Sequence, residues 1–185
     1  MENSIPSRYN GVAIAFHWLQ AIMITASFGV GLYMVSLTMS PTRIKLYNWH
    51  KWAGVAILTI AALRLLWRLT HSPPALSANM PQWQTSIAKM THLMLYGLFF
   101  AVPLTGWAYS SAAGFPIVWF GVIPLPDFVP KDRDLAEFLK PFHWMAAYAL
   151  ASLVALHVLG VIKHLVMDDD NLLSRMLPPM SGERK

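Results

Sequence analysis

The stretch that decides the fold is FHWMAAYALASLVALHVLGVIKHLV, residues 142–166. It carries no charged residue between Lys140 and Lys163, and its length matches the roughly 20 apolar residues that a helix needs to cross a bilayer. The composition agrees, because 56% of the 185 residues are hydrophobic and only 12% are charged, against about a quarter in a soluble domain. The sequence therefore predicts an integral membrane protein.

Three further apolar runs cover residues 12–37, 47–69 and 87–111. The first is too long for the core of a secretory signal, which has about 7 to 15 apolar residues, so we interpret it as an uncleaved span. Residues 71–84 are rich in proline and small polar residues and cannot continue a helix. We expect an all-α integral membrane protein, with residues 1–185 forming a single membrane domain built as a bundle of four transmembrane helices.

The longest connection, residues 112–141, contains PIVWFGVIPLPDFVP followed by the charged KDRDLAEFLK. It is apolar, but its prolines interrupt it too often for a membrane span. We expect an interfacial loop that covers one end of the bundle, with a short amphipathic helix over residues 132–139 that begins at an acidic cap.

Basic residues predict the orientation of the four spans, which place both termini on one side. The formal net charge is +5, and the basic residues flank apolar runs instead of forming a patch, which argues against nucleic-acid binding. The terminal side carries eight of them: Arg8, Arg64, Arg68, Lys89, Lys163, Arg175, Arg184 and Lys185. The other side carries six: Arg43, Lys45, Lys51, Lys131, Arg133 and Lys140. This excess predicts that both termini are cytoplasmic.

Two histidines lie on one face of the fourth run, because His143 and His157 are 14 residues apart. At about 100° and 1.5 Å per residue, they share a direction and differ in depth by roughly 21 Å. An unpaired imidazole is unfavourable in hydrocarbon. Neutral imidazole is a good ligand of haem iron, and two imidazoles can fill the two axial positions of one iron. The chain has no cysteine, so a haem here is bound non-covalently and is b-type. We therefore predict two haem b groups, stacked across the bilayer inside the bundle.

Depth in the membrane restricts which histidines meet. The second span begins on the outer side and carries His50 there, so His50 is the expected partner of His143. The first and third spans begin on the inner side, so the partner of His157 is His17 or His92. Depth alone does not separate these two alternatives.

Two other positions repeat the spacing of 14 residues. Arg64 follows His50 by 14 residues and is expected at the inner level, where it would hold a haem propionate; the alternative is that Arg64 and Arg68 anchor the helix end among lipid headgroups. Gly31 follows His17 by the same interval, and its missing side chain either admits the edge of a porphyrin or permits close helix packing.

The motifs resemble those of the bacterial cytochrome b-561 family of small four-helix dihaem membrane proteins. The resemblance covers most of the chain: Arg8 ahead of FHW, WHKWAG with LRLLWR, HLMLYGLFFAVPLTGW, and HVLGVIKHLV followed by DNLLSRMLP. It implies that His17 and His157 bind one haem iron and that His50 and His143 bind the other. His92 is then expected to be a hydrogen-bonding neighbour of the inner haem. The resemblance also implies a location in the bacterial inner membrane and ubiquinone as one redox partner.

Two imidazoles on each iron leave no open position for oxygen, so electron transfer is the expected chemistry. The resemblance implies an oxidoreductase that oxidises superoxide at the outer surface and reduces ubiquinone. Lys51, next to His50, is the candidate for guiding superoxide, and His164 is a candidate contact of a propionate or a quinone. The alternatives are an electron-transfer subunit that docks a dehydrogenase or a periplasmic redox protein through residues 115–129, and a purely structural membrane bundle.

Overall fold

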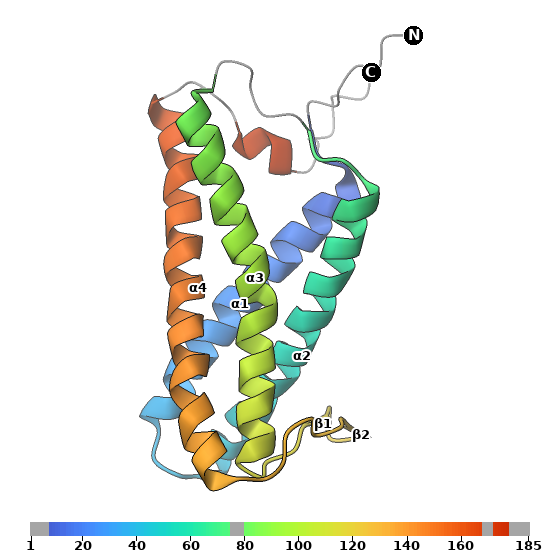
Figure 1. Ribbon diagram of the computed structural model, residues 1–185, viewed down its shortest axis with the longest axis vertical. Helices are drawn as coiled ribbons and strands as arrows, with labels where there is room; N and C mark the ends of the chain where they lie inside the picture. The colour runs from blue at the N-terminus through green and yellow to red at the C-terminus, as the bar shows by residue number, and fades with distance from the viewer. Residues whose placement is uncertain (1–7, 75–79, 168–171, 178–185) are drawn as a thin grey trace.

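The computed structural model describes residues 8–74, 80–167 and 172–177, and within them the chain forms four long helices. They are α1 (Gly11–Ser36), α2 (Pro41–Thr70), α3 (Gln82–Ala112) and α4 (Arg133–Met167). The helices alternate in direction, so that α1 begins and α4 ends at the same end of the bundle (Figure 1). All four are long and apolar enough to cross a membrane, as the apolar runs predict. We call the end where α1 begins the terminal end and the opposite end the hairpin end.

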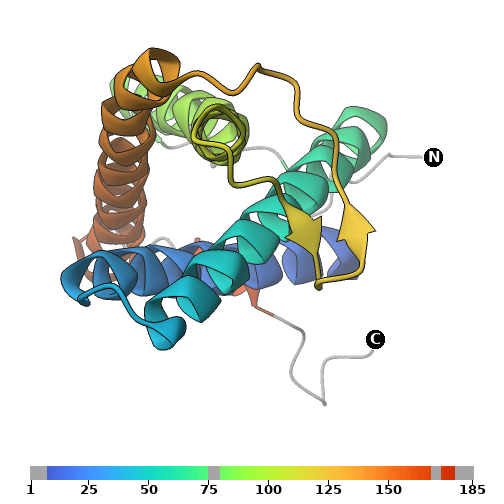
Figure 2. The same cartoon turned by 90° about the horizontal axis from the view of Figure 1, so that it is seen from below.

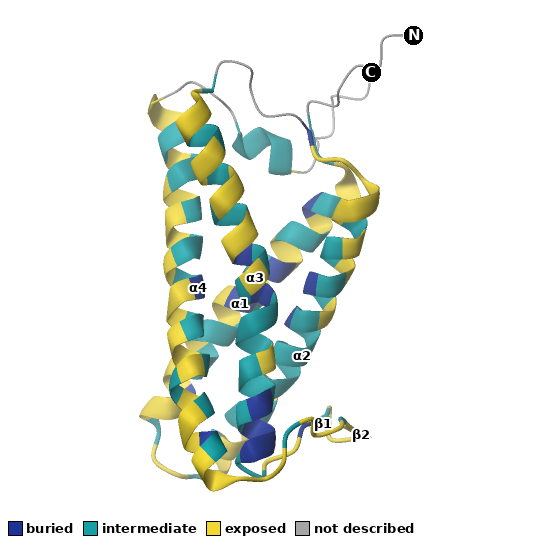
Figure 3. Ribbon diagram, viewed as in Figure 1, coloured by how far each residue is buried: buried dark blue, intermediate teal, exposed yellow. Residues whose placement is uncertain are grey.

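The outer surface of the bundle is apolar, as expected for a surface that faces lipid. Buried positions are few and lie in the middle of the bundle and at the hairpin end of α3 (Figure 3). Large apolar side chains on the outside, including Ile22, Leu66 and Val166, are between 61% and 75% exposed. Helix α1 packs mainly along α2, and α3 packs mainly along α4 (Figure 2).

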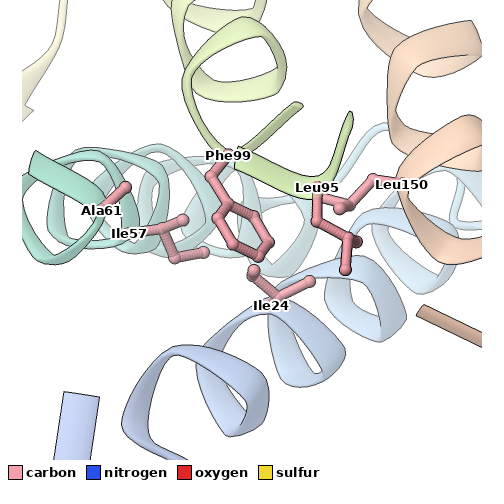
Figure 4. Close-up of a cluster of buried hydrophobic side chains, with 6 residues drawn as sticks. All are labelled: Ile24, Ile57, Ala61, Leu95, Phe99 and Leu150. Atoms are coloured by element: carbon pink, nitrogen blue, oxygen red, sulfur yellow. The ribbon is translucent and has the colours of Figure 1, made fainter. Parts of the chain in front are cut away.

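An apolar core layer crosses the middle of the bundle and contains residues from all four helices (Figure 4). It consists of Ile24, Ile57, Ala61, Leu95, Phe99 and Leu150. Leu150 lies seven residues, or about 10 Å, from both His143 and His157 along α4. Ile24 and Ile57 likewise follow a histidine by seven residues. The core layer therefore separates two levels at which histidines lie.

Three helices, α2, α3 and α4, begin five or more residues before the apolar runs that predict them, because hydropathy marks only the part of a helix that lies in hydrocarbon. Helix α2 begins at Pro41, where the Ser40 side chain accepts a hydrogen bond from the Arg43 N–H at 3.3 Å. Helix α3 begins five residues early, at Gln82. These polar first turns extend the helices beyond the apolar runs.

The expectation of a separate short helix over residues 132–139 is wrong, because these residues form the first turns of α4. The expected acidic cap is present: the Asp132 carboxylate accepts a hydrogen bond from the Leu135 N–H at 3.0 Å. Helix α4 then continues through Pro141, although a proline inside a helix removes one backbone hydrogen bond. The charged segment and the fourth apolar run are therefore one element.

A small β-hairpin lies inside the connection that the sequence predicts as an interfacial loop. Its strands are β1 (Val118–Trp119) and β2 (Ile123–Pro124), which pair antiparallel. The turn contains Phe120 at φ 52° and Gly121 at φ 73°. A bulky residue rarely adopts positive φ, so the hairpin was not predictable from local propensity.

Candidate haem sites

At the hairpin end, α2 and α4 bring His50 and His143 together with their ring centroids 6.2 Å apart. Two imidazoles bound to one metal at about 2 Å, with about 1 Å more to each ring centre, have centroids about 6 Å apart. The observed separation therefore fits a single iron between the two rings, as the depth argument predicts for this pair.

Backbone carbonyls orient both rings of this pair through their Nδ1 atoms. His50 Nδ1 lies 3.1 Å from the Ser27 carbonyl oxygen, and His143 Nδ1 lies 3.0 Å from the Val102 carbonyl oxygen. A carbonyl only accepts, so each Nδ1 carries the hydrogen and donates it. The Nε2 atom of each neutral imidazole is then left with a lone pair, as a metal ligand requires.

Two glycines make room for the imidazoles at the hairpin end. A Cβ atom on Gly106 of α3 would lie 2.7 Å from His143 Cε1, closer than real side chains come. A Cβ atom on Gly31 of α1 would lie 3.2 Å from His50 Cε1. The missing side chain of Gly31 therefore admits a histidine ring from the neighbouring helix, which the sequence argument did not anticipate.

A cavity of about 100 Å³ adjoins this pair, and both His50 and His143 line it. Lys51 also lines the cavity, and its Nζ donates to the carbonyl oxygens of Phe115 and Pro116, each at 3.3 Å. Lys51, the candidate for guiding superoxide, is thus half-buried. It holds the interfacial loop by these hydrogen bonds and places a positive charge beside His50 and His143.

At the terminal end, three imidazoles meet. His17 and His157 have ring centroids 6.2 Å apart, the same separation as the other pair. His92 lies closer to His157, at 5.4 Å, which leaves less room for an iron between two rings. The spacing thus fits His17 better than His92 as the partner of His157.

Arg64 reaches into the bundle at this level instead of extending to the outside. Its Nη2 lies 3.1 Å from His17 Nδ1, and its Nη1 donates to the Gln20 side-chain oxygen at 3.3 Å. Its guanidinium also lies 5.4 Å from the ring centre of Tyr96. Arg68, one turn later, is exposed. The Arg68 guanidinium also lies 5.4 Å from the ring centre of Tyr96, so the two arginines differ in burial and in the contacts that Arg64 makes with His17 and Gln20.

Gln20 is a site residue that the sequence argument missed. It is fully buried, and its side-chain nitrogen has no hydrogen-bond partner among the described residues. The available signal was a polar residue three positions after His17 inside an apolar run, because buried polar groups in membrane helices commonly mark a functional site. Buried polar groups normally have a hydrogen-bond partner. The Gln20 side-chain nitrogen would gain one if the polar edge of a ligand were bound at this level, beside His17 and Arg64.

A larger cavity of about 290 Å³ opens at the terminal end. Its lining comes from α1, α2 and α3, the segments next to them, and the C-terminal segment: Arg8, Tyr9, Asn10, Ala13, Arg64, Trp67, Arg68, His71, Ser72, Pro73, Pro74, His92, Tyr96 and Met176. His71, to which the sequence argument gave no role, stacks on Trp67 with ring centroids 3.8 Å apart. His164 lies in the last turn of α4 and is not among the described lining residues.

The C-terminal segment folds back against the start of α1 at this end (Figure 1). It contains the short 3₁₀ helix η1 (Leu173–Met176). Trp18 Nε1 donates to the Met176 carbonyl at 2.7 Å, and Arg8 donates to the Leu177 carbonyl at 2.9 Å. These contacts join two motifs that lie more than 150 residues apart in sequence and place Met176 in the cavity wall.

Comparison with known proteins gives matches over nearly the whole chain. The family model described as prokaryotic cytochrome b561 matches residues 8–179. Cytochrome b561 homolog 2 of Escherichia coli (strain K12) is 32% identical over 179 residues, which cover 96% of this chain and 95% of that protein. The probable superoxide oxidase CybB of Yersinia pestis is 27% identical, over 95% of this chain and 98% of that protein. Cytochrome b561 homolog 1 of Escherichia coli (strain K12) is 26% identical, with coverages of 93% and 98%.

Proposed function

The chain belongs to the prokaryotic cytochrome b561 family of membrane haem proteins, and from this premise we propose that it carries two b-type haems and transfers electrons across the bacterial inner membrane. His50 and His143 bind the haem iron at the hairpin end, and His17 and His157 bind the iron at the terminal end. The observation that carries this proposal is the equal centroid separation of the two pairs, 6.2 Å.

A haem held in this way supplies a reversible carrier of one electron. The protein's own contribution is to fill both axial positions with imidazole, which excludes oxygen from the metal. Arg64 would neutralise a propionate at the terminal end; its guanidinium, which donates to His17 Nδ1 in this structure, would donate to the carboxylate instead, and His17 would then carry its hydrogen on Nδ1 and leave Nε2 free for the iron. The core layer around Leu150 keeps the space between the two levels dry.

The proposed reaction oxidises superoxide at the hairpin end and reduces ubiquinone. Two superoxide anions lose one electron each and become two molecules of oxygen. Ubiquinone gains both electrons together with two protons and becomes ubiquinol. Support for superoxide as the donor comes from the relative of Yersinia pestis that is named a probable superoxide oxidase.

The orientation proposed for this reaction puts the terminal end in the cytoplasm and the hairpin end outside. The excess of basic residues on the terminal side supports it. At the hairpin end, Lys51 adds a positive charge beside the cavity that His50 and His143 line, which favours the approach of a small anion.

A second candidate function is electron transfer for a separate dehydrogenase or periplasmic redox protein. The observation that favours it is the apolar surface of the hairpin end, where Phe115, Phe120 and Val122 are 69%, 64% and 78% exposed. Exposed apolar groups of this kind commonly mark a contact with a protein or a membrane.

A rapid-mixing experiment with the purified, haem-loaded protein distinguishes the two functions. We expect added superoxide to reduce the haem, superoxide dismutase to abolish this reduction, and ubiquinone-1 to reoxidise the haem. Haem that stays oxidised in superoxide but is reduced by dithionite would reject the first function and favour a partner protein as the electron donor.

A further inference from the structure

The β-hairpin formed by β1 and β2 has an apolar outer surface that neither haem site uses. Residues 115–126, all of which the structure describes, contain no charged side chain, and only Ile117 among them is buried. Phe115, Phe120 and Val122 are 69%, 64% and 78% exposed. We propose that the tip of the hairpin, residues 120–123, inserts into the adjacent lipid leaflet and anchors this end of the bundle in it. This anchor is independent of the proposed reaction.

The hairpin projects to one side of the bundle at the hairpin end (Figures 1 and 2). Two hydrogen bonds fix it to α2: Trp52 Nε1 donates to the Val118 carbonyl oxygen at 2.7 Å, and Trp119 Nε1 donates to the Trp52 carbonyl oxygen at 3.3 Å. The Phe120 ring also contacts Trp52, with ring centroids 5.4 Å apart. The depth of the hairpin in the membrane is therefore set by the depth of Trp52.

The residues around Trp52 are those of a membrane interface. Trp49 lies three residues earlier on α2, which is about 4.5 Å along the helix axis. It is 49% exposed, and Lys45 Nζ lies 5.1 Å from its ring centre. Tryptophan is enriched at the boundary between hydrocarbon and headgroups, and lysine extends from there toward water. The hairpin thus lies at the edge of the hydrocarbon layer, where its apolar surface continues the lipid-facing surface of the bundle.

The backbone of the hairpin is suited to a nonpolar surrounding. All five carbonyl oxygens of residues 115–119 accept a hydrogen bond, the first two from Lys51 Nζ and the others from backbone N–H groups or the Trp52 indole. The three prolines within residues 115–126 have no N–H group to satisfy. An unpaired backbone group is unfavourable in lipid, because no water is present to bond it. The hairpin reduces this cost before it meets the lipid.

The competing occupant is a redox protein from the aqueous side, as in the second candidate function. Interfaces between proteins commonly contain about ten direct hydrogen bonds. In residues 115–126 the only polar side-chain atom is Trp119 Nε1, which already donates to Trp52, and the carbonyl oxygens of residues 115–119 are also in use. Figure 2 shows the hairpin beside α2 and not over the centre of the bundle. These features favour the bilayer.

The chain contains no cysteine, so a single introduced thiol can be followed without background. The test measures the rate at which iodoacetamide alkylates Val122→Cys, by mass spectrometry, in the haem-loaded protein in phosphatidylcholine nanodiscs that hold one copy each. Arg133→Cys is the aqueous control, because this position is exposed at the start of α4, and Leu66→Cys is the lipid control on the outside of α2. Alkylation requires the thiolate, which lipid disfavours, so we expect Val122→Cys to react about tenfold more slowly than Arg133→Cys. After denaturation in detergent all three should react alike.

Val122 is 78% exposed in the structure, so slow alkylation in the nanodisc would come from lipid and not from burial within the chain. Phe120→Cys gives a second position in the tip and should show the same protection if Val122→Cys fails to bind haem. Equal rates at positions 122 and 133 would overturn the proposal. The tip would then lie in water, where it is available to a docked redox protein.

Discussion

At the scale of single residues, the assignment of His17 over His92 is the most sensitive point of the site. Both rings lie near His157, but only His17 has the centroid separation of the hairpin-end pair, 6.2 Å. We predict that His17→Ala lowers the pyridine haemochrome value from two haems per chain to one, whereas His92→Ala retains two. If His92→Ala removed a haem and His17→Ala did not, the pairing at the terminal end would be wrong.

Arg64 is the second residue whose role is open to a direct measurement. A guanidinium close to the terminal-end haem disfavours the oxidised, more positive state, so Arg64→Gln should lower the midpoint potential of that haem. A lost interaction of about 1.4 kcal/mol corresponds to about 60 mV for one electron. A spectroelectrochemical titration measures the shift, and the exposed Arg68→Gln serves as the comparison with a smaller effect. Equal potentials in wild type and Arg64→Gln would mean that Arg64 has no haem contact.

At the scale of elements, the close approach of α3 to α4 depends on Gly106. A Cβ atom there would lie 2.7 Å and 2.9 Å from His143 Cε1 and Nδ1, so Gly106→Ala must displace the ring or separate the helices. We predict that Gly106→Ala loses the hairpin-end haem and keeps the other. Gly97→Ala in the same helix is the matched control, because a Cβ there meets nothing within 4 Å. Haem content that is the same in the two variants would show that the contact at Gly106 does not position His143.

The sequence predicts the elements better than it predicts their contacts. Four apolar runs mark four helices, and the helical rise predicts which histidines share a depth, because both depend on properties that are local along the chain. The partner of His157 was not decided by depth, since α1 and α3 both begin at the same end. The roles of Gly106 and Gln20 depend on which helices are neighbours, and the hairpin depends on positive φ at Phe120, which is rare for that residue.

At the scale of the whole molecule, the two histidine levels have different surroundings. The hairpin-end rings donate to neutral backbone carbonyls and have Lys51 in their cavity wall, whereas the terminal end contains Arg64 and opens into a cavity with two further arginines. Positive charge near a haem raises its reduction potential, so the asymmetry favours electron movement from the hairpin end to the terminal end. This direction agrees with superoxide as the donor and ubiquinone as the acceptor.

The route of superoxide into the molecule gives the last prediction. Superoxide is an anion that crosses hydrocarbon poorly, so it must reach the hairpin-end haem from the water on that side, where Lys51 lines the cavity beside His50. Attraction between exposed charges is screened over roughly 8 Å at physiological ionic strength, so the rate of haem reduction should fall as salt rises. Lys51→Glu should lower the rate of haem reduction further, because a glutamate at this position repels superoxide. Salt screens this repulsion, so the contribution of this position to the salt dependence should change sign.

Because Lys51 also donates to the Phe115 and Pro116 carbonyls, Lys51→Glu alters the interfacial loop as well as the charge. Lys51→Gln removes the charge and keeps a donor, so it separates the two effects: a loss of rate with Lys51→Gln that disappears at high salt identifies the charge as the cause. Stopped-flow measurement over a range of ionic strength gives the rate of haem reduction and its dependence on salt for each variant. If neither salt nor Lys51→Glu changes the rate of haem reduction by superoxide, this entry route is rejected. The electron would then come from a protein docked on the exposed hairpin.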